Sequence, residues 1–310
     1  MADPVALAAM AIDAALGWPV RLYAVVGHPV GAFARLIALC DRHWNRTDRS
    51  RLARKAWGVV IVLALVTVSG CSGLLLTLAA QTLGSAEWLI IALLAWPALA
   101  QRSLDQHVVP VIRALRADDI ETARTAVGMI VGRDTAAMNQ AAVSRAAIES
   151  LAESFCDGVV APLFWLLMAG LPGIWIVKAV NTADSLIGHK EEPYRDFGWA
   201  AARLDDVLNF APARISAMLI CLGGAGGWTI CWRYRNAHAS PNAGWPEAAM
   251  AGVLNVRLAG PTSYDGEIMD KPWIGEGGEA SLEALIRARR VYHRACALCW
   301  VIAGGIAWLA

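Results

Sequence analysis

Three acidic residues, Glu149, Glu153 and Asp157, follow one another at intervals of four. On an α-helix this spacing places the three carboxylates in a line on one face. Carboxylates this close repel one another unless a cation lies among them, and a site built from oxygen ligands alone suits Mg²⁺. The spacing therefore indicates a magnesium site. An exposed acidic face that Arg145 partly neutralises would explain the same pattern.

A second polar group lies in the stretch "NTADSLIGHKEEPYRDFG" at 181–198. Asn181 and Asp184 are three residues apart, so a helix continuing from Lys178 would present an amide oxygen and a carboxylate together. Asp205 belongs to another such group, with Arg203 beside it. Because this stretch directly follows an uncharged segment, its polar groups would be costly unless they face a cavity or a partner, which favours a functional role.

Two further stretches could bind anions. In "GRDT", at 132–135, free backbone N–H groups and Arg133 could hold a phosphate, whereas Asp134 would oppose an anion unless it binds the metal or caps a helix. "SPNAGWPEAAMAG", at 240–252, is another helix start that contains Asn242 and Glu247. Ordinary helix capping explains both stretches equally well. His28 precedes a predicted helix and is either a base or a structural residue.

The elements that must position these residues are predicted to be membrane helices. Hydrophobic residues make up 57% of the 310 residues and charged residues only 17%. We predict an all-α, multi-pass integral membrane protein that forms a single domain over 1–310. About four to five spans are expected near 57–80, 86–101, 158–177, 213–232 and 295–310, with extramembrane segments at 102–157 and 233–294 and no β-sheet.

Several boundaries can be predicted more closely. A helix should begin at Pro29. Asp118 and Glu121 have the spacing of a capping box, which predicts that a helix begins there and stops at Gly132. Asp134 or Thr135 should cap the helix that follows. The charge-free segment 158–177 should break at "GLPG", 170–173.

Arginine clusters at 42–55 and 287–294 predict that these flanks face the cytoplasm. If 158–177 crosses the bilayer fully, the polar run 181–210 lies on the opposite side from 102–157. If the segment turns back at its break, both runs lie on one side or in one cavity. The sequence leaves these alternatives open.

Six motifs, in this order, carry a resemblance to a known family: "HPVG", "MIVGRDT", "ESLAESFCDGVVAPLFW", "KAVNTADSLIGH", "YRDFGWAAARLDDVLNFAPAR" and "SPNAGWPEAAMAG". Between about Asp13 and Ile274 the chain resembles the adenosylcobinamide-phosphate synthase family, the CobD/CbiB membrane proteins of cobalamin biosynthesis. It departs from the family pattern at His189 and Glu191, where an aromatic residue and an Asn are common.

The resemblance implies a carbon–nitrogen ligase of the cytoplasmic (inner) membrane, with its active site facing the cytoplasm. Such an enzyme joins adenosylcobyric acid to (R)-1-amino-2-propanol or its O-phosphate, using ATP and Mg²⁺. Its expected partners are the lipid bilayer and other late cobalamin-pathway membrane enzymes, with no nucleic acid.

On this basis we expect three sets of site residues. The metal ligands are Glu149, Glu153, Asp157, Asp184 and Asp205. Substrate and phosphate contacts come from Arg133, Thr135, Asn181, Arg203, Asn242 and Glu247. Catalytic groups are Asp134, His28 and Lys178. Asn181 and Asp184 should face the row of acids at 149–157, so that one wall of the site lies where the membrane segment ends.

Two other functions fit parts of the sequence. An intramembrane, Mg²⁺-dependent prenyltransferase-like enzyme would use the acidic groups but leave "GWPEAAMAG" and "GRDT" unexplained. A non-enzymatic corrinoid transport or assembly subunit would use polar residues between the spans to line a path. Amide formation by the purified protein would distinguish the three.

Overall fold

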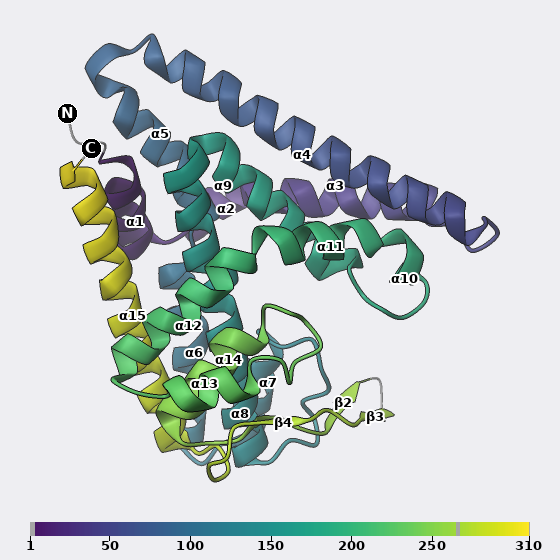
Figure 1. Ribbon diagram of the computed structural model, residues 1–310, viewed down its shortest axis with the longest axis vertical. Helices are drawn as coiled ribbons and strands as arrows, with labels where there is room; N and C mark the ends of the chain where they lie inside the picture. Colours follow the sequence, from purple (N-terminus) through teal and green to yellow (C-terminus); the bar gives the residue numbers. More distant parts are fainter. Residues whose placement is uncertain (1–3, 265–266, 310) are drawn as a thin grey trace. The chain divides into compact units, whose positions relative to one another are not determined.

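The computed structural model describes residues 4–264 and 267–309 and is almost entirely helical (Figure 1). The predicted all-α class is confirmed. The chain forms two compact units. Unit 1 comprises Met1–Ala100, Ala161–Asn209 and Ala303–Ala310, and unit 2 comprises Gln101–Val160 and Phe210–Ile302. Each unit is built from segments that are distant in the sequence.

Unit 1 contains most of the long apolar helices. Its elements are α1 (Val5–Leu16), α2 (Val20–Val26), α3 (Pro29–Trp44), α4 (Arg51–Gln81), the 3₁₀ turns η1 (Gly84–Ala86) and η2 (Trp96–Ala98), α5 (Glu87–Ala95), α9 (Ala161–Ile187), α10 (Tyr194–Phe197) and α11 (Trp199–Leu208). The predicted helix start at Pro29 is confirmed.

Unit 2 combines helices with a small β-segment. Its elements are α6 (Gln101–Arg116), α7 (Ile120–Gly128), α8 (Gln140–Phe155), the π-helical turn η3 (Cys156–Val160), α12 (Phe210–Gly224), α13 (Trp228–Tyr234), α14 (Gly244–Leu254), most of α15 (Leu282–Leu309) and strands β1 (Leu258–Ala259), β2 (Thr262–Tyr264), β3 (Glu267–Met269) and β4 (Trp273–Ile274).

The expectation of no β-sheet was wrong for this segment. β1 pairs antiparallel with β4, with Leu258 opposite Ile274, and β2 pairs antiparallel with β3. Strands of two or three residues are too short to show the alternation by which a strand is recognised in a sequence. They matter here because β1 and β4 carry residues of the site described below.

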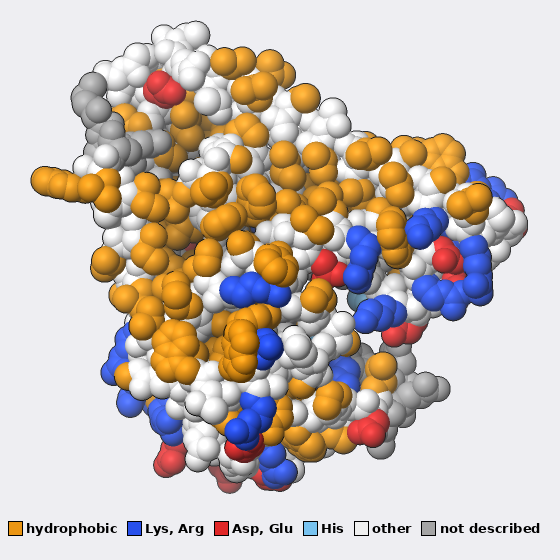
Figure 2. Space-filling view, in the orientation of Figure 1, with side chains coloured by type: hydrophobic (Ala, Val, Ile, Leu, Met, Phe, Trp, Pro, Cys, Tyr) orange, Lys and Arg blue, Asp and Glu red, His pale blue; other side chains and the backbone are white. Residues whose placement is uncertain are grey.

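Four helical segments in the described residues are long and apolar enough to cross a membrane: Arg51–Gln81, Gly84–Arg116, Gln140–Ile187 and Leu282–Leu309. Two bent helix pairs, α1 with α2 and α11 with α12, raise the number to six if each pair is one span. These candidates extend into 102–157, which we expected to lie wholly outside the membrane. Figure 2 shows hydrophobic side chains over the surface of α4, in keeping with exposed Leu63, Leu74 and Leu75.

The core of unit 1 forms where α4 packs against α9. A Cβ atom at Gly73 would lie 2.7 Å from the backbone of Pro172, so only glycine permits this approach. Within α9 the backbone departs from helical geometry at Ala169 and Gly170, where Gly170 has a φ of 61°. The predicted break at "GLPG" is therefore confirmed, and the polar end of α9 continues as the expected helix through Lys178 and Asp184.

Two predicted helix caps were wrong. Asp119, not Asp118, caps α7, because its Oδ1 accepts from the N–H of Thr122 at 3.0 Å. α7 ends at Gly128 rather than Gly132. α8 begins at Gln140, where Oδ1 of Asn139 accepts from the N–H of Ala142 at 2.8 Å. The loop at 129–139 is thus longer than predicted and carries "GRDT" outside both helices.

Candidate active site

Arg133 and Glu149 form the centre of a buried polar cluster in unit 2. Nη2 of Arg133 donates to Oε2 of Glu149 at 2.7 Å, and the two side chains are 8% and 12% exposed. The backbone N–H of Ala259 donates to Oε1 of Glu149 at 2.7 Å, and Nη1 of Arg133 donates to Oγ1 of Thr262 at 3.3 Å. A buried ion pair is tolerated only when further hydrogen bonds satisfy its remaining groups, as they do here.

The loop that presents Arg133 is fastened at both ends. Oγ of Ser150, on α8, donates to the carbonyl of Ile130 at 2.8 Å. Nε of Arg124, on α7, donates to the carbonyl of Met138 at 2.8 Å. The guanidinium of Arg133 is therefore directed toward α8 by bonds on either side of it, although the loop has no regular secondary structure.

Glu247 lies in the first turn of α14 and is 4% exposed. Its Oε1 is 3.9 Å from Nε2 of His238, and its Oε2 is buried with no hydrogen-bond partner among the described residues. Burial raises the pKa of Glu247 well above its usual value, and the nearby Glu149 and Glu153 carboxylates add to the increase. Glu247 is thus a buried carboxyl group that holds its proton more tightly than an exposed glutamate does.

The line of three acids is interrupted by a π-helical turn. Glu153 is on α8, whereas Asp157 lies in η3, where the i to i+5 bonding changes the angular spacing of side chains. Glu153 still interacts with both Asp157 and Glu149. Both carboxylate oxygens of Glu149 already accept hydrogen bonds, one from Arg133 and one from Ala259. In the described residues there is no group of three or more His, Cys, Asp or Glu side chains arranged to hold a metal ion.

The donor chemistry nevertheless fits Mg²⁺. This ion commonly takes one or two protein carboxylates and completes its shell with waters and substrate phosphates. Glu153, with Asp157 or Glu247, supplies the oxygen-only donors that this mode requires. Magnesium binding by Glu149, Glu153 and Asp157 stays a prediction, and Glu149 also holds Arg133.

The other predicted residues of unit 2 have different surroundings. Thr135 lies against the end of α7, where its Oγ1 would be 3.3 Å from a Cβ atom at Gly128. Oδ1 of Asn242 accepts from Nη1 of Arg214 at 2.9 Å. Asp134 is exposed on the same loop as Arg133. The structure thus brings Arg133, Glu149, Glu153 and Glu247 together, and Thr135 and Asn242 have structural contacts of their own.

A second cluster lies in unit 1. Asp205 is 9% exposed, and its two carboxylate oxygens accept from Nδ2 of Asn181 at 3.5 Å and from Nδ2 of Asn209 at 3.0 Å. The carboxylate of Asp184 also interacts with it. Arg203, half exposed, pairs with Asp206 at 2.9 Å. The two groups that were predicted separately thus meet at Asp205, which accepts hydrogen bonds from two amide side chains.

His28 caps α3. Its Nδ1 accepts from the N–H of Val30 at 3.2 Å, which places the proton of a neutral ring on Nε2. Burial and, to a smaller extent, the Lys178 ammonium lower the pKa of His28, so the neutral form is favoured. A neutral ring whose Nδ1 is already bonded has no free lone pair for a base, so this geometry supports the structural alternative. Catalytic roles for His28 and Lys178 stay predictions.

Glu149 and Asp184 belong to different units, so their predicted approach is untested and also stays a prediction. The sequence did not indicate several residues of the unit 2 cluster, namely Ala259, Thr262, His238 and Lys271. Ala259 has a φ of 57°, just before Gly260 and Pro261. That Gly-Pro pair was the one available signal, and it indicated a turn without revealing which side chain the turn would contact.

Comparison with known proteins shows which family the chain resembles. A model of the CobD/CbiB protein family matches residues 6–292. The chain belongs to the CobD/CbiB family. It is 46% identical over 308 residues to "Cobalamin biosynthesis protein CobD" of Rhodobacter capsulatus, covering 97% of this chain and 96% of the relative. The CobD protein of a Sinorhizobium species is also 46% identical, over 299 residues and 93% of each chain.

More distant relatives follow the same pattern. The CobD protein of Brucella anthropi is 41% identical over 285 residues, which cover 89% of this chain and 87% of the relative. No solved structure matches the chain. The relatives support a role in cobalamin biosynthesis and, with it, corrinoid-type substrates. The resemblance stated from the six sequence motifs is confirmed.

Proposed function

We propose that this protein is an amide synthase that joins adenosylcobyric acid to (R)-1-amino-2-propanol or its O-phosphate, using ATP and Mg²⁺, and its membership of the CobD/CbiB family supports a role in cobalamin biosynthesis. The observation that carries the proposal is the buried cluster in unit 2, where Glu149, Glu153 and Glu247 gather around Arg133. Joining a carboxylate to an amine requires an activated carboxyl group, a deprotonated amine and a stabilised leaving group. The cluster offers groups suited to each requirement.

Activation transfers the terminal phosphoryl group of ATP to the substrate carboxylate, and the amine then displaces phosphate as the amide bond forms. Arg133 is suited to holding the moving phosphoryl group. Guanidinium has five N–H donors, and the bonds to Glu149 and Thr262 leave others available in a fixed direction. Bound Mg²⁺ would supply charge neutralisation of the phosphates, with Glu153 as its principal protein ligand.

Glu247 is suited to accepting the proton that the substrate ammonium must lose before the amine can attack. An effective general base has a pKa close to the working pH, and the pKa of this buried carboxyl is raised in that direction. Its Oε2 has no hydrogen-bond partner among the described residues, so this oxygen can accept from a substrate. Because α14 fixes the backbone of Glu247, the carboxyl is held in place before the substrate binds.

The direct experiment is reconstitution of the reaction. The full chain, purified in detergent, is mixed with adenosylcobyrate, either amine and Mg·ATP, and the amide product is identified by mass. We expect product only when ATP is present. Asp48→Asn is a matched control for variants in the cluster, because Asp48 is exposed and pairs with the exposed Arg46 in unit 1. No product with either amine, or equal product without ATP, would show that the proposed reaction is wrong.

We also propose that the cluster faces the cytoplasm, where the soluble substrates are. A single Cys at Ala136, which is exposed on the Arg133 loop, can report this in a background without the seven native cysteines. We expect an impermeant maleimide to label it in inverted vesicles and not in intact spheroplasts. Labelling of the spheroplasts alone would place the loop on the opposite side.

A further inference from the structure

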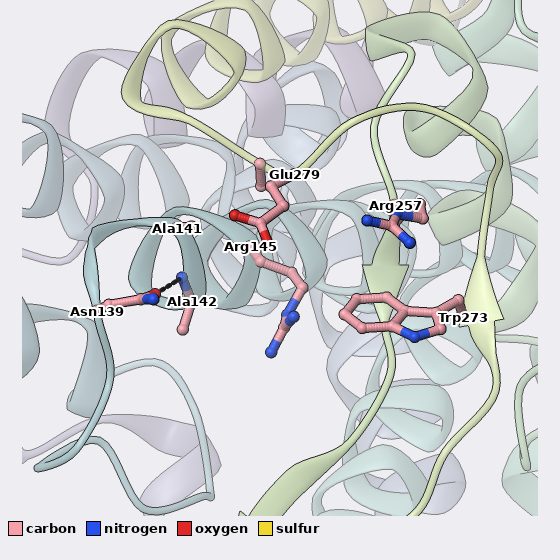
Figure 3. Close-up of a pocket in the computed structure, with 8 residues that line it drawn as sticks. Asn139, Ala141, Ala142, Arg145, Arg257, Trp273 and Glu279 are labelled. Atoms are coloured by element: carbon pink, nitrogen blue, oxygen red, sulfur yellow. Dashed lines mark hydrogen bonds between the residues drawn. The ribbon is translucent and has the colours of Figure 1, made fainter.

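A small pocket in unit 2 is lined by residues that the proposed mechanism leaves unused. It has a volume of about 160 Å³ and lies among Asn139, Ala141, Ala142, Arg145, Arg257, Trp273, Glu279 and Ala280. Figure 3 shows the Arg145 side chain extending into the space between the first turn of α8 and the indole of Trp273. Sites for drug-sized ligands occupy roughly 300–1,000 Å³. This pocket therefore suits one small group rather than a nucleoside or a corrin ring.

Two guanidinium groups dominate its charge. Arg145 and Arg257 lie over the Trp273 ring, with their central carbons 4.9 and 5.2 Å from its centroid. The Nε atom of each is buried and has no hydrogen-bond partner among the described residues. An arginine stacked on an aromatic face keeps its N–H donors at the edge of the guanidinium plane. Stacking on Trp273 thus holds each guanidinium group in place, and N–H donors at the edge of its plane can point into the pocket.

The start of α8 adds further positive potential. Asn139 accepts from the N–H of Ala142, whereas the N–H of Ala141 has no acceptor among the described residues. A helix of 16 residues carries a partial positive charge at this end. Glu279, the one acid in the lining, offsets only one of the two guanidinium charges. The net field in the pocket therefore favours an anion.

Local backbone bonds hold the far wall in place. The N–H of Arg257 donates to the carbonyl of Gly278 at 2.8 Å, beside the bridge between Val256 and Gly278. β1 pairs with β4 through Ala259 and Trp273. Arg257, Trp273 and Glu279 are therefore positioned by the same short β-segment, and Arg145 approaches them from α8.

The geometry points to a binding pocket for the phosphate group of a small phosphomonoester, held by Arg145, Arg257 and the first turn of α8. This inference deepens the proposed function and rests on it. The pocket adjoins the proposed active site, because Nε of Arg145 is 3.7 Å from Oε1 of Glu149, the carboxylate that holds Arg133. Glu279, on the exposed side, can attract an ammonium group carried by the same ligand. An aliphatic amine phosphate matches both charges, whereas a nucleotide could place only its terminal phosphate in this volume.

Calorimetric titration of the detergent-purified full chain tests the pocket without turnover. The probes are inorganic phosphate, phosphoethanolamine, ethanolamine and ATP without Mg²⁺. We expect phosphate and phosphoethanolamine to bind and ethanolamine not to bind. Phosphoethanolamine binding tighter than ATP identifies a small amine ester as the source of the phosphate, and the reverse order identifies the nucleotide.

Variants distinguish phosphate binding in the pocket from non-specific phosphate binding to a basic surface. Arg257→Gln should weaken phosphate binding at least about tenfold, the lower limit for a hydrogen bond between charged groups. Arg257→Lys should restore part of the loss. Arg113→Gln removes one exposed arginine of unit 2 outside the pocket and should change the Kd by less than about twofold. Equal weakening by Arg257→Gln and Arg113→Gln, or no phosphate binding to the parent chain, would overturn the assignment.

Glu279→Gln independently tests whether Glu279 binds the ammonium group of the ligand. Removing the acid should leave inorganic phosphate binding intact or tighter, while the advantage of phosphoethanolamine over phosphate disappears. An unchanged advantage would refute the role of Glu279. Amide formation without phosphate binding defeats this inference alone, and phosphate binding without amide formation defeats the proposed function alone, so the two failures are distinguishable.

Discussion

The two polar clusters of this protein differ in what surrounds their carboxylates. In unit 1, Asp205 receives two neutral amides, from Asn181 and Asn209. In unit 2, Glu149 receives a guanidinium, and Glu247 is left with a buried oxygen that has no hydrogen-bond partner among the described residues. Amide donors satisfy the Asp205 carboxylate, and the buried atom without a hydrogen-bond partner among the described residues is here the neutral Oδ1 of Asn209. A charged cluster with an unsatisfied oxygen is costly to build and is expected where a substrate completes it.

This contrast is not visible in the sequence. Carboxylates of both clusters were predicted to bind metal. What distinguishes them is the partner of each carboxylate, and the partner is set by tertiary structure. The first test therefore substitutes the partner rather than the acid.

The largest expected effect is that of Arg133→Lys. A lysine keeps the charge but cannot bond to Glu149 and Thr262 while presenting further donors to a phosphoryl group. We expect amide formation to fall by a factor of about 100 or more, comparable to the loss of one oxyanion donor. The initial rate with saturating Mg·ATP measures it, and size-exclusion chromatography checks folding. Near-parental activity would remove the basis for placing the chemistry in unit 2.

Next in size is the effect of the acids on magnesium dependence. Glu153→Gln should raise the Mg²⁺ concentration for half-maximal turnover about tenfold or more, because Mg²⁺ uses few protein carboxylates. Asp205→Asn should leave that concentration unchanged and lower thermal stability instead, since a neutral side chain can accept from only one of the two asparagines. If Asp205→Asn raises the Mg²⁺ requirement as much, the two clusters share a metal function and the contrast between them fails.

Much of the fold and part of the site were predictable. The helix from Pro29 and the break at residue 170 are local features, which a sequence reports directly. The contact between Glu149 and Ala259 spans 110 residues and depends on a two-residue strand. A strand of two residues is too short to show a periodic pattern in the sequence, so the β-segment and its pocket were missed.

A third prediction concerns Glu247 and pH. Burial, Glu149 and Glu153 raise its pKa in the folded protein above the reference value of 4.5, with Arg133 and Lys271 acting in the opposite direction. The folded state therefore holds the proton more tightly than the unfolded chain, and this stabilisation is complete below pH 4.5 and is lost as pH rises through the folded pKa. Glu247→Gln lacks the titration.

The variant should consequently unfold at a higher temperature than the parent at neutral pH, and the difference should vanish near pH 4.5. The same variant should lose turnover, because a glutamine cannot accept a proton. Thermal unfolding in detergent from pH 4.5 to 8 measures the first effect, and the rate of amide formation measures the second. A variant less stable than the parent across this range would contradict the raised pKa. His238, which faces Glu247, is left unchanged in both proteins.

The smallest expected effect tests the correction to the α7 N-cap, which sets where α7 begins. Asp119→Ala removes the bond to the N–H of Thr122 and should cost about 1 kcal/mol, or about fivefold faster hydrogen exchange in the first turn of α7. Asp118→Gly is the matched control, because it removes the side chain and glycine adopts the φ of 56° at this position without strain. Exchange in a peptide covering 119–128 should change only in the first variant. If Asp118→Gly also speeds exchange there, the capping box predicted from the sequence would be the better description, and α7 would begin one residue earlier.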